Sequence, residues 1–258
     1  MGTAHVQGKL WGARARDYAN LAEEAFRPLY ETVFDATGVG AETRLLDVGC
    51  GPGLAAYLAA RRGAQVAGID AAETSVAIAR ERTPEGDFRV GDLEELPWPD
   101  HSFDVVTGFN SFPFAADLVH ALREAKRVAR PGGRIAMAVW GRPEDCETPI
   151  TVAAVNKLLP PPPQVNSIPL YTPGRVEALM REAGLAPIAG HEVECAFLFP
   201  DLETAVRGLM SAGVMVAAAQ QMGEETVRQV VAASLASFRT EDGGYCQRNR
   251  FRYVIAAA

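Results

Sequence analysis

The stretch Leu45–Gly53, Leu-Leu-Asp-Val-Gly-Cys-Gly-Pro-Gly, constrains the fold of this chain more than any other. It begins as a short apolar run of the kind that forms a buried parallel strand. It ends in glycines at alternate positions, Gly49, Gly51 and Gly53, and an alanine- and leucine-rich helix former follows at 54–60. A strand that turns through glycines onto a helix exposes backbone N–H groups and lets a ligand approach the main chain. The stretch therefore predicts a nucleotide-type site, and a tight turn without a ligand is the alternative.

The residues that this loop lacks decide between classes of nucleotide site. The dinucleotide fingerprint needs a third glycine three residues after the second, and that position is Leu54. A phosphate-binding P-loop needs Gly-Lys-Ser/Thr, and the loop contains no lysine. With Asp47 leading into it, the loop instead resembles the first motif of class I S-adenosylmethionine-dependent methyltransferases. That resemblance implies S-adenosylmethionine as the cofactor and S-adenosylhomocysteine as its product.

Composition limits the partners that such a chain can have. Its 258 residues, 48% of them hydrophobic and 22% charged, suit one large α/β domain. A formal net charge of −7 argues against nucleic acid, because phosphate backbones require a basic patch. No apolar run is long enough to span a membrane, and the first six residues contain no apolar signal core. We therefore expect a cytoplasmic protein. The four cysteines lack metal-type spacing, so we expect no metal site.

Two predicted strands after the loop end in acidic residues. The first places Asp70 close to the chain spacing at which a carboxylate binds ribose in Rossmann-like units. A solvated aspartate, or an N-cap for a helix over 72–82, is the alternative. The second ends at Asp92, and the segment 91–100 resembles the adenine-binding segment of the same family. That resemblance implies that Asp92 accepts from the adenine amino group and that the Leu93 N–H donates to a ring nitrogen, whereas a loop aspartate without a ligand is the alternative.

The carboxyl end of the next predicted strand, within 101–110, should lie at the mouth of the site, because open α/β sheets bind ligands there. Asn110 could bind the amino-acid end of the cofactor. Phe112 could line an acceptor pocket or pack against the next helix. Trp140 ends the predicted fifth strand, 134–140, and could line the same pocket.

A helix is predicted over 117–130, with apolar residues at helical spacing, and Pro131-Gly132-Gly133 should end it. The segment 123–133 resembles the helix and turn before strand five in the ubiquinone/menaquinone methyltransferase-like group of small-molecule enzymes. This is a structural signature, and it adds no catalytic residue.

Two other regions are predicted to be helical and to cover the site. Residues 10–35 have helical periodicity, and we expect the segment 1–40 to form a lid. Its Trp11 and Tyr18 resemble the N-terminal pattern of many small-molecule methyltransferases, in which an aromatic side chain closes over the cofactor. The alternative is that both merely anchor the helix to the core. Residues 201–240 are expected to form a helical insertion over the acceptor pocket.

The remaining elements are predicted from apolar runs and turn residues. We expect a linker over 141–171, a helix beginning at Thr172-Pro173, a sixth strand over 188–198 and a last strand over 250–255. Prolines 160–163 should stiffen the linker, and peptide recognition by this run is the alternative.

Taken together, these elements and the resemblance predict an α/β fold with one methyltransferase domain over 1–258. The implied architecture is a Rossmann-like seven-stranded mixed sheet in the order 3-2-1-4-5-7-6, with strand seven antiparallel and helices on both faces.

The resemblance also assigns residues to the two ligands. For the cofactor these are Tyr18, Asp47, Gly49, Cys50, Gly51, Gly53, Asp70, Ala71, Gly91, Asp92, Leu93 and Asn110, and for the substrate pocket Trp11, Phe112 and Trp140. Cys50 is expected for its small size within the loop, with a reactive thiol as the alternative. The implied activity is methyl transfer to a small, mostly apolar metabolite, with an oxygen or nitrogen acceptor favoured, by a monomer or homodimer.

No catalytic residue is identified, because the four histidines lie in a predicted tail, a turn, a helix start and a strand start. Methyl transfer from a sulfonium depends chiefly on holding both partners in line. Two other functions stay open. One is a protein of this fold that binds the cofactor without methylating, as a ligand-binding or rearrangement protein. The other is an NAD-type oxidoreductase, which is disfavoured by Leu54 and because no tyrosine has a lysine four residues later.

Overall fold

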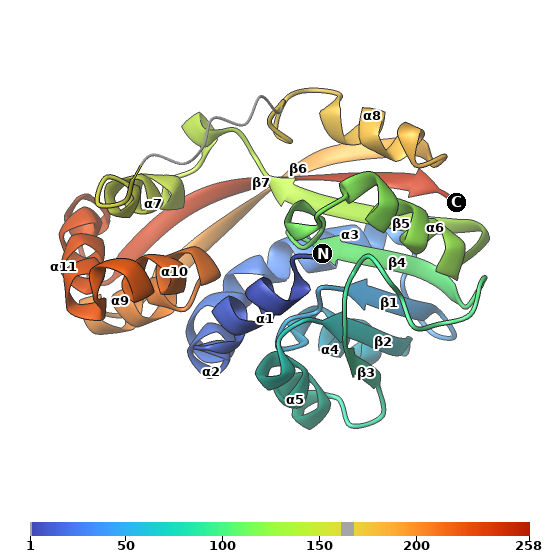
Figure 1. The fold of residues 1–258 in the computed structure, drawn as a ribbon, viewed down its shortest axis with the longest axis horizontal. Coiled ribbons are helices and arrows are strands. Elements are labelled where there is room, and N and C mark those ends of the chain that lie inside the picture. Colours follow the sequence, from blue (N-terminus) through green and yellow to red (C-terminus); the bar gives the residue numbers. More distant parts are fainter. Residues whose placement is uncertain (1, 161–167) are drawn as a thin grey trace.

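The computed structural model describes residues 2–160 and 168–258 and has a seven-stranded sheet at its centre (Figure 1). The strands lie in the predicted order β3-β2-β1-β4-β5-β7-β6. Neighbours from β3 to β5 pair in parallel, and β7 pairs antiparallel with both β5 and β6. The strands are β1 (Arg44–Val48), β2 (Gln65–Asp70), β3 (Asp87–Val90), β4 (Phe103–Phe109), β5 (Ala129–Trp140), β6 (Ala186–Phe199) and β7 (Tyr245–Ala257). The predicted Rossmann-like mixed sheet is confirmed.

Two hydrophobic layers sandwich the sheet, because successive side chains of a strand point to opposite faces. Leu45 of β1 packs into one layer and its neighbour Leu46 into the other, and both side chains are fully buried. The first layer is covered by α3 (Arg27–Thr37), α4 (Leu54–Arg61) and α5 (Glu73–Arg82), and the second by α6 (Leu118–Val128) and α8 (Arg175–Glu182). Helices on both faces are therefore confirmed (Figure 1).

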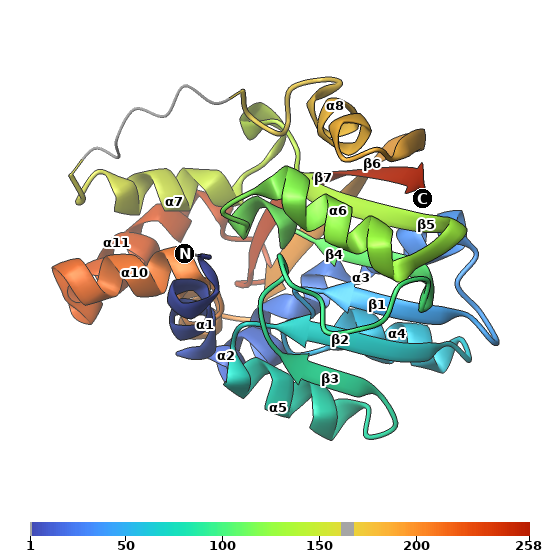
Figure 2. The same ribbon diagram turned by 45° about the vertical axis from the view of Figure 1, so that its right-hand side comes forward.

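A group of helices lies beyond the carboxyl ends of the parallel strands, as Figure 2 shows. It consists of α1 (Ala4–Gly12), α2 (Ala15–Asp17), α7 (Thr148–Asn156), α9 (Leu202–Met210), α10 (Gly213–Met222) and α11 (Glu224–Ser234). Segments far apart in the sequence meet here, because α1 packs against α10 and the segment after α2 packs against α9. We call these six helices, with the turns 18–26, the helical cover.

The helical character predicted over 10–35 is confirmed, but the segment is not one continuous α-helix. After α2 the chain forms a π-helical turn (Tyr18–Ala22) and a 3₁₀ turn (Glu23–Phe26) before α3 begins. These turns direct Glu23 and Phe26 into the core. The spacing of apolar residues cannot indicate such a break, because it assigns every glutamate to the solvent-exposed face of a helix.

Several element boundaries also differ from the prediction. β5 begins at Ala129 instead of Arg134, because Ala129 pairs with Phe103 of β4 and draws the turn residues into the strand. β6 and β7 extend beyond the predicted strands because they pair with each other along their full length.

The helices after β5 need correction as well. The predicted linker 141–171 contains α7, whose first turn holds a proline, a position where proline is compatible with a helix. α8 begins at Arg175, after Gly174 with φ of +79°, and not at Thr172-Pro173. Residues 201–240, which were predicted to be helical, form three α-helices and a final 3₁₀ turn. Pro161–Pro163 lie outside the described residues, so the role of the proline run stays a prediction.

Within the described residues, no single helix is long and apolar enough to cross a membrane. One pair, α9 and α10, reaches that length and composition only when combined, and the two helices meet at 91°.

Candidate functional site

The glycine loop after β1 owes its shape to three left-handed glycines. Gly49, Gly51 and Gly53 have φ of +73°, +52° and +84°, which L side chains rarely adopt. A Cβ at Gly49 would stand 2.2 Å from the Cβ of Ser111, and one at Gly53 2.7 Å from the Cβ of Ala79. A Cβ at Gly51 would meet nothing within 4 Å. The outer glycines therefore fasten the loop to the scaffold, and the middle one borders open space that a ligand could enter.

Cys50 is buried beneath the loop, where its side chain lies next to Gly68 of β2. Burial raises the pKa of its thiol well above the usual range. A thiol in this setting stays protonated and unreactive, so small size and not reactivity explains the residue.

Asp70, half-buried at the end of β2, holds the loop through its carboxylate. Its Oδ2 accepts from the Gly51 N–H at 2.9 Å, and its Oδ1 accepts from the Ala72 N–H at 2.8 Å. Burial raises the pKa of this carboxyl, and the two backbone donors oppose the rise. Each carboxylate oxygen can accept a further hydrogen bond, so two vicinal hydroxyls still fit.

Asp47 lies deeper, on β1, where it is 2% exposed and accepts from the Thr107 hydroxyl of β4 at 2.8 Å. Burial raises the pKa of its carboxyl to about 7, and the carboxylates of Glu23 and Asp70 add to the rise. The strand ends thus gather several acidic groups in a small volume.

Glu23 is a site residue that the sequence analysis missed. It is 2% exposed, accepts from the Leu54 N–H at 3.0 Å and pairs with Arg82 at 2.6 Å. Tyr30 of α3 was missed too, and its buried ring lies 4.6 Å from that of Phe109 at the end of β4. No local signal marks either residue, because both are positioned by contacts between distant segments.

The loop after β3 is fixed by acidic side chains at its start. Asp92 Oδ1 accepts from the Glu94 N–H at 3.0 Å. Glu94 in turn accepts from the N–H groups of Ala116 at 3.0 Å and Asp117 at 2.8 Å, just before α6. A Cβ at Gly2 would stand 2.3 Å from Asp92 Oδ2, so the amino-terminal segment lies directly on this carboxylate.

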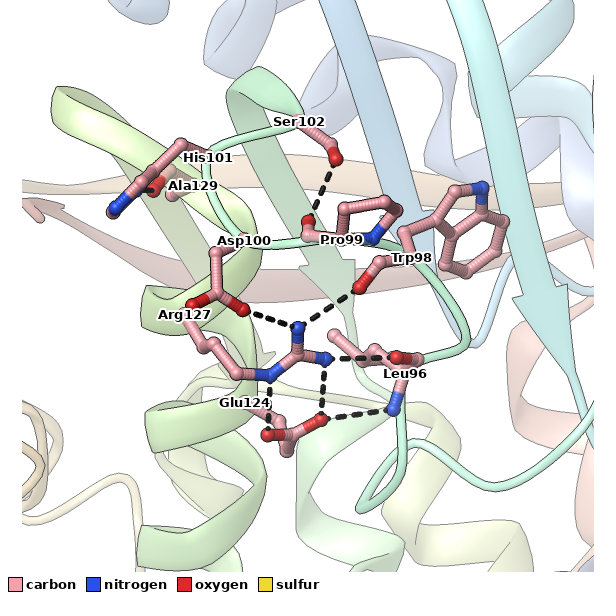
Figure 3. A network of polar contacts seen from close by, with 9 residues as sticks. All are labelled: Leu96, Trp98, Pro99, Asp100, His101, Ser102, Glu124, Arg127 and Ala129. Carbon is pink, nitrogen blue, oxygen red and sulfur yellow. Dashed lines mark hydrogen bonds and ion pairs between the residues drawn. The ribbon is translucent and has the colours of Figure 1, made fainter.

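The same loop is tied to α6 by a network around Arg127 (Figure 3). The guanidinium donates to the carbonyls of Leu96 at 2.8 Å and Trp98 at 2.9 Å. It also pairs with Asp100 at 2.9 Å and Glu124 at 2.8 Å, and Glu124 accepts from the Leu96 N–H at 3.0 Å. This network fixes the far end of the segment that the resemblance assigns to adenine.

Asn110, at the end of β4, is the clearest unsatisfied group of the site. Its φ is +56°, a left-handed conformation that asparagine tolerates better than most residues. Its side-chain Oδ1 is buried and has no hydrogen-bond partner among the residues that the structure describes. Buried acceptors are rarely left unpaired, so this oxygen fits a ligand donor such as the ammonium group of S-adenosylmethionine.

Helix α1 lies across the rim formed by these residues. A Cβ at Gly8 would stand 2.3 Å from the carbonyl oxygen of Ala71, and the Thr74 hydroxyl donates to the Gly12 carbonyl at 2.8 Å. Trp11 contacts the rings of Tyr18 and Phe114 edge-on, with centroids 5.6 and 5.7 Å away. α1 itself has no buried residue, so its position depends on these contacts along one side.

One pocket prediction is wrong. Phe112 is fully buried against β4, where Gly108 leaves room for its ring, and it packs in the layer under α6. It therefore lines no accessible pocket.

Trp140 is half-buried, and its ring lies 4.5 Å from the ring of Phe251 and 6.3 Å from that of Phe197. Their rings pack together in a group that we call the aromatic cluster, which consists of Phe26, Tyr30, Phe109, Trp140, Phe197 and Phe251.

None of the four histidines is buried in the site. His5, His101, His120 and His191 are all exposed. Within the described residues, no group of three or more His, Cys, Asp or Glu side chains could hold a metal ion.

Comparisons with known proteins agree with this geometry. A family model described as a methyltransferase domain matches residues 46–137. The 27-O-demethylrifamycin SV methyltransferase of Amycolatopsis mediterranei (strain S699) is 32% identical over 209 residues, which cover 74% of this chain and 73% of that protein. The nocamycin O-methyltransferase of Saccharothrix syringae is 31% identical over 234 residues, which cover 82% and 83% of the two chains.

Among solved structures, the [4+2]-cyclase SpnF aligns with a TM-score of 0.57 at 22% identity, over 89% of this chain and 80% of that chain. This likeness concerns the fold alone. The two curated relatives match in sequence over most of their length, and the glycine loop with its strand-end acids lies in the part that the family model covers. The chain therefore belongs to the class I S-adenosylmethionine-dependent methyltransferases, and S-adenosylmethionine is its cofactor.

Proposed function

We propose that this protein transfers a methyl group from S-adenosylmethionine to a hydroxyl oxygen of a small, mostly apolar metabolite. The observation that carries the proposal is the open main chain at Gly51, flanked by Asp70 and the unpaired Asn110 oxygen. The preference for oxygen over nitrogen comes from the two relatives, whose names describe a methyltransferase for 27-O-demethylrifamycin SV and a nocamycin O-methyltransferase.

The cofactor would lie across the carboxyl ends of β1 and β2. Asp70 would accept from the ribose hydroxyls, Asp92 from the adenine amino group, and Asn110 from the ammonium group. Asp47 would stand beneath the glycine loop as a buried carboxyl whose ionised form a cationic ligand would favour. The Leu93 N–H would serve an adenine nitrogen, and Ala71 and Gly91 would form the rim of the site between β2 and the loop after β3.

The helical cover would act as the lid and as the wall of the acceptor pocket. α1 would close over the cofactor, with its Trp11 packed against Tyr18 of the turn that follows α2. The aromatic cluster supports an apolar acceptor, because an acceptor pocket next to it would be largely apolar, and such pockets take up small molecules. The net charge of −7 favours a small acceptor over a nucleic acid, whose phosphates would be repelled. The active protein would be a monomer or a homodimer.

Methyl transfer from S-adenosylmethionine needs little direct chemical participation by individual side chains. S-adenosylmethionine supplies a methyl group already activated as a sulfonium, so the residues must chiefly hold two partners in line and exclude water. With all four histidines exposed, we assign no histidine base. The hydroxyl proton would leave to water or buffer.

The test has two stages. Calorimetric titration should first detect binding of S-adenosylmethionine and of S-adenosylhomocysteine. The protein is then incubated with methyl-labelled S-adenosylmethionine and a panel of apolar alcohols, phenols and amines, and the labelled products are analysed by NMR.

Label on the oxygen of a small molecule is the expected result. Label on nitrogen, or only in RNA or protein, would overturn the acceptor. Tight cofactor binding without any transfer would favour a non-methylating function, of the kind that the name of the SpnF cyclase describes for a protein of this fold. No binding at all would overturn the cofactor assignment to these residues.

A further inference from the structure

Glu23 is a buried carboxylate for which methyl transfer itself has no use. It lies in the helical cover, in the 3₁₀ turn before α3, and is 2% exposed. Its neighbour Glu24 is exposed and pairs only with Arg27 on the surface. A buried carboxylate is costly unless it is paired and hydrogen-bonded, so its partners explain why it is there.

Those partners belong to the two helices that follow the strand ends of the cofactor site. Oε1 accepts from the N–H of Leu54, the first residue of α4, at 3.0 Å. Gly53 in the N-cap position has no side chain, so this helix end obtains its acceptor from a residue 31 positions earlier. Oε2 accepts from Arg82 near the end of α5 at 2.6 Å. One carboxylate therefore joins the cover, the glycine loop and α5.

These contacts depend on the closed position of the cover. If residues 4–26 moved away, the Leu54 N–H would lose its acceptor and Arg82 its only ion-pair partner among the described residues. Closing the cover restores both and buries the carboxylate again. Helix α1 has no buried residue of its own, so within 4–26 the core contacts besides Glu23 are confined to the later residues Ala15, Ala22 and Phe26.

We propose that Glu23 is a positioning residue that couples closure of residues 4–26 to the ligand-ready shape of the glycine loop. The proposal rests on the cofactor site described above. Closure brings the Glu23 carboxyl close to Asp47 and Asp70, with Arg82 as the one cation bonded to it among the described residues. Burial raises the pKa of all three carboxyls, and their ionised forms leave an excess of negative charge beside the loop. A cationic cofactor is attracted by that excess, so cofactor binding should stabilise the closed cover.

The experiment measures cofactor affinity and backbone hydrogen exchange on the full-length protein. In the wild type, S-adenosylmethionine should slow exchange over 4–26 and over 50–58 together. In Glu23→Ala we expect about tenfold weaker binding, which is the loss of roughly one charge-assisted hydrogen bond. At saturating cofactor, 50–58 should still be protected in this variant, whereas 4–26 should exchange rapidly. The matched control Glu24→Ala should behave as the wild type.

A purely structural role for Glu23 makes a different prediction. It would lower the melting temperature but leave protection of the two segments coupled at saturating cofactor, and that result would overturn the proposal. Binding of Glu23→Ala within about twofold of the wild type would overturn it too. If Glu23→Ala does not fold, Glu23→Gln and Arg82→Met carry the test, and Arg82→Lys should retain most of the coupling. A wild type that binds no S-adenosylmethionine would refute the proposed function instead, so the two failures are distinguishable.

Discussion

The glycine-loop region and the helical cover are held in place by different kinds of interaction. In the loop region, shape comes from left-handed glycines and from a strand-end aspartate only 19 residues further along the chain. In the cover, α1 has no buried residue, and position comes from contacts between segments about 200 residues apart, such as Trp11 against Gly213. The glycine-loop region is held by its backbone conformation, whereas the helical cover is held by packing against distant parts of the chain.

This difference has a functional consequence. Cofactor chemistry is shared within the family and lies in the region that local sequence specifies. The proposed acceptor pocket would be bounded by the cover and the aromatic cluster, whose members come from α3, β4, β5, β6, β7 and the turn before α3. Acceptor identity can therefore change through long-range packing without altering the cofactor motif.

The largest effect is expected where local conformation is broken. In Gly49→Ala, the new Cβ would stand 2.2 Å from that of Ser111, at a φ of +73°. We expect a loss of at least about 2–4 kcal/mol in the free energy of unfolding, because strain and overlap add. Chemical denaturation followed by circular dichroism measures it.

Gly40→Ala is the matched control for this variant. Gly40 lies in the turn before β1, its φ is not in the left-handed range, and a Cβ there would meet nothing within 4 Å. It should change stability by less than about 1 kcal/mol. Equal losses in the two variants would mean that the loop is no more constrained than an ordinary turn.

The sequence predicted the glycine-loop region better than it predicted the helical cover. The glycine loop and the position of Asp70 at a strand end were predictable, because each depends on a short local pattern, and the sheet order followed from the family resemblance. Asp92 was expected to end a strand, but β3 ends at Val90 and Asp92 lies in the loop that follows. Glu23 was not, because a glutamate within a helical pattern indicates solvent. Phe112 was misplaced because the periodicity of the strand does not report that Gly108 leaves room for its ring.

The next effect concerns Asp70, whose carboxylate should link the loop to the cofactor. Asp70→Ala removes the acceptor of the Gly51 and Ala72 N–H groups as well as the proposed ribose partner. We expect cofactor affinity to fall by about 10- to 100-fold, which is one or two hydrogen bonds to a charged group. Calorimetric titration measures it, and Glu73→Ala, exposed in the first turn of α5, is the control. Unchanged affinity in Asp70→Ala would refute the ribose role.

A smaller effect should appear in the pH dependence of cofactor binding. Burial raises the pKa of Asp47 from 3.8 to about 7, so between these values the folded protein holds a proton that the unfolded chain has released. Stability from this group is therefore lost as pH rises from about 4 to 7, and levels off above 7. A cationic cofactor should lower this pKa, so binding releases a proton and affinity rises with pH up to about 7, by at most tenfold per unit.

Calorimetry in buffers of different ionisation enthalpy would measure the released proton near pH 6.5. Asp47→Asn keeps an acceptor for Thr107 but cannot titrate, so the dependence should vanish in this variant. A proton release that persists in Asp47→Asn would have to come from the cofactor or from another group.

The smallest effect on stability, and the one that tests the cover directly, is expected for Gly8→Ala. Alanine favours a helix over glycine by about 1 kcal/mol, so α1 itself should form at least as well. Its new Cβ, however, would stand 2.3 Å from the Ala71 carbonyl oxygen, and a main-chain atom cannot move aside as a side chain can. The helix should therefore form but dock poorly, with a melting temperature near that of the wild type and a cofactor dissociation rate raised about three- to tenfold. Stopped-flow fluorescence measures this rate, and Lys9→Ala, exposed on the same helix, should leave it unchanged. Equal rates in the two variants would mean that α1 does not close over the cofactor, and the cover would then be a wall of the acceptor pocket alone.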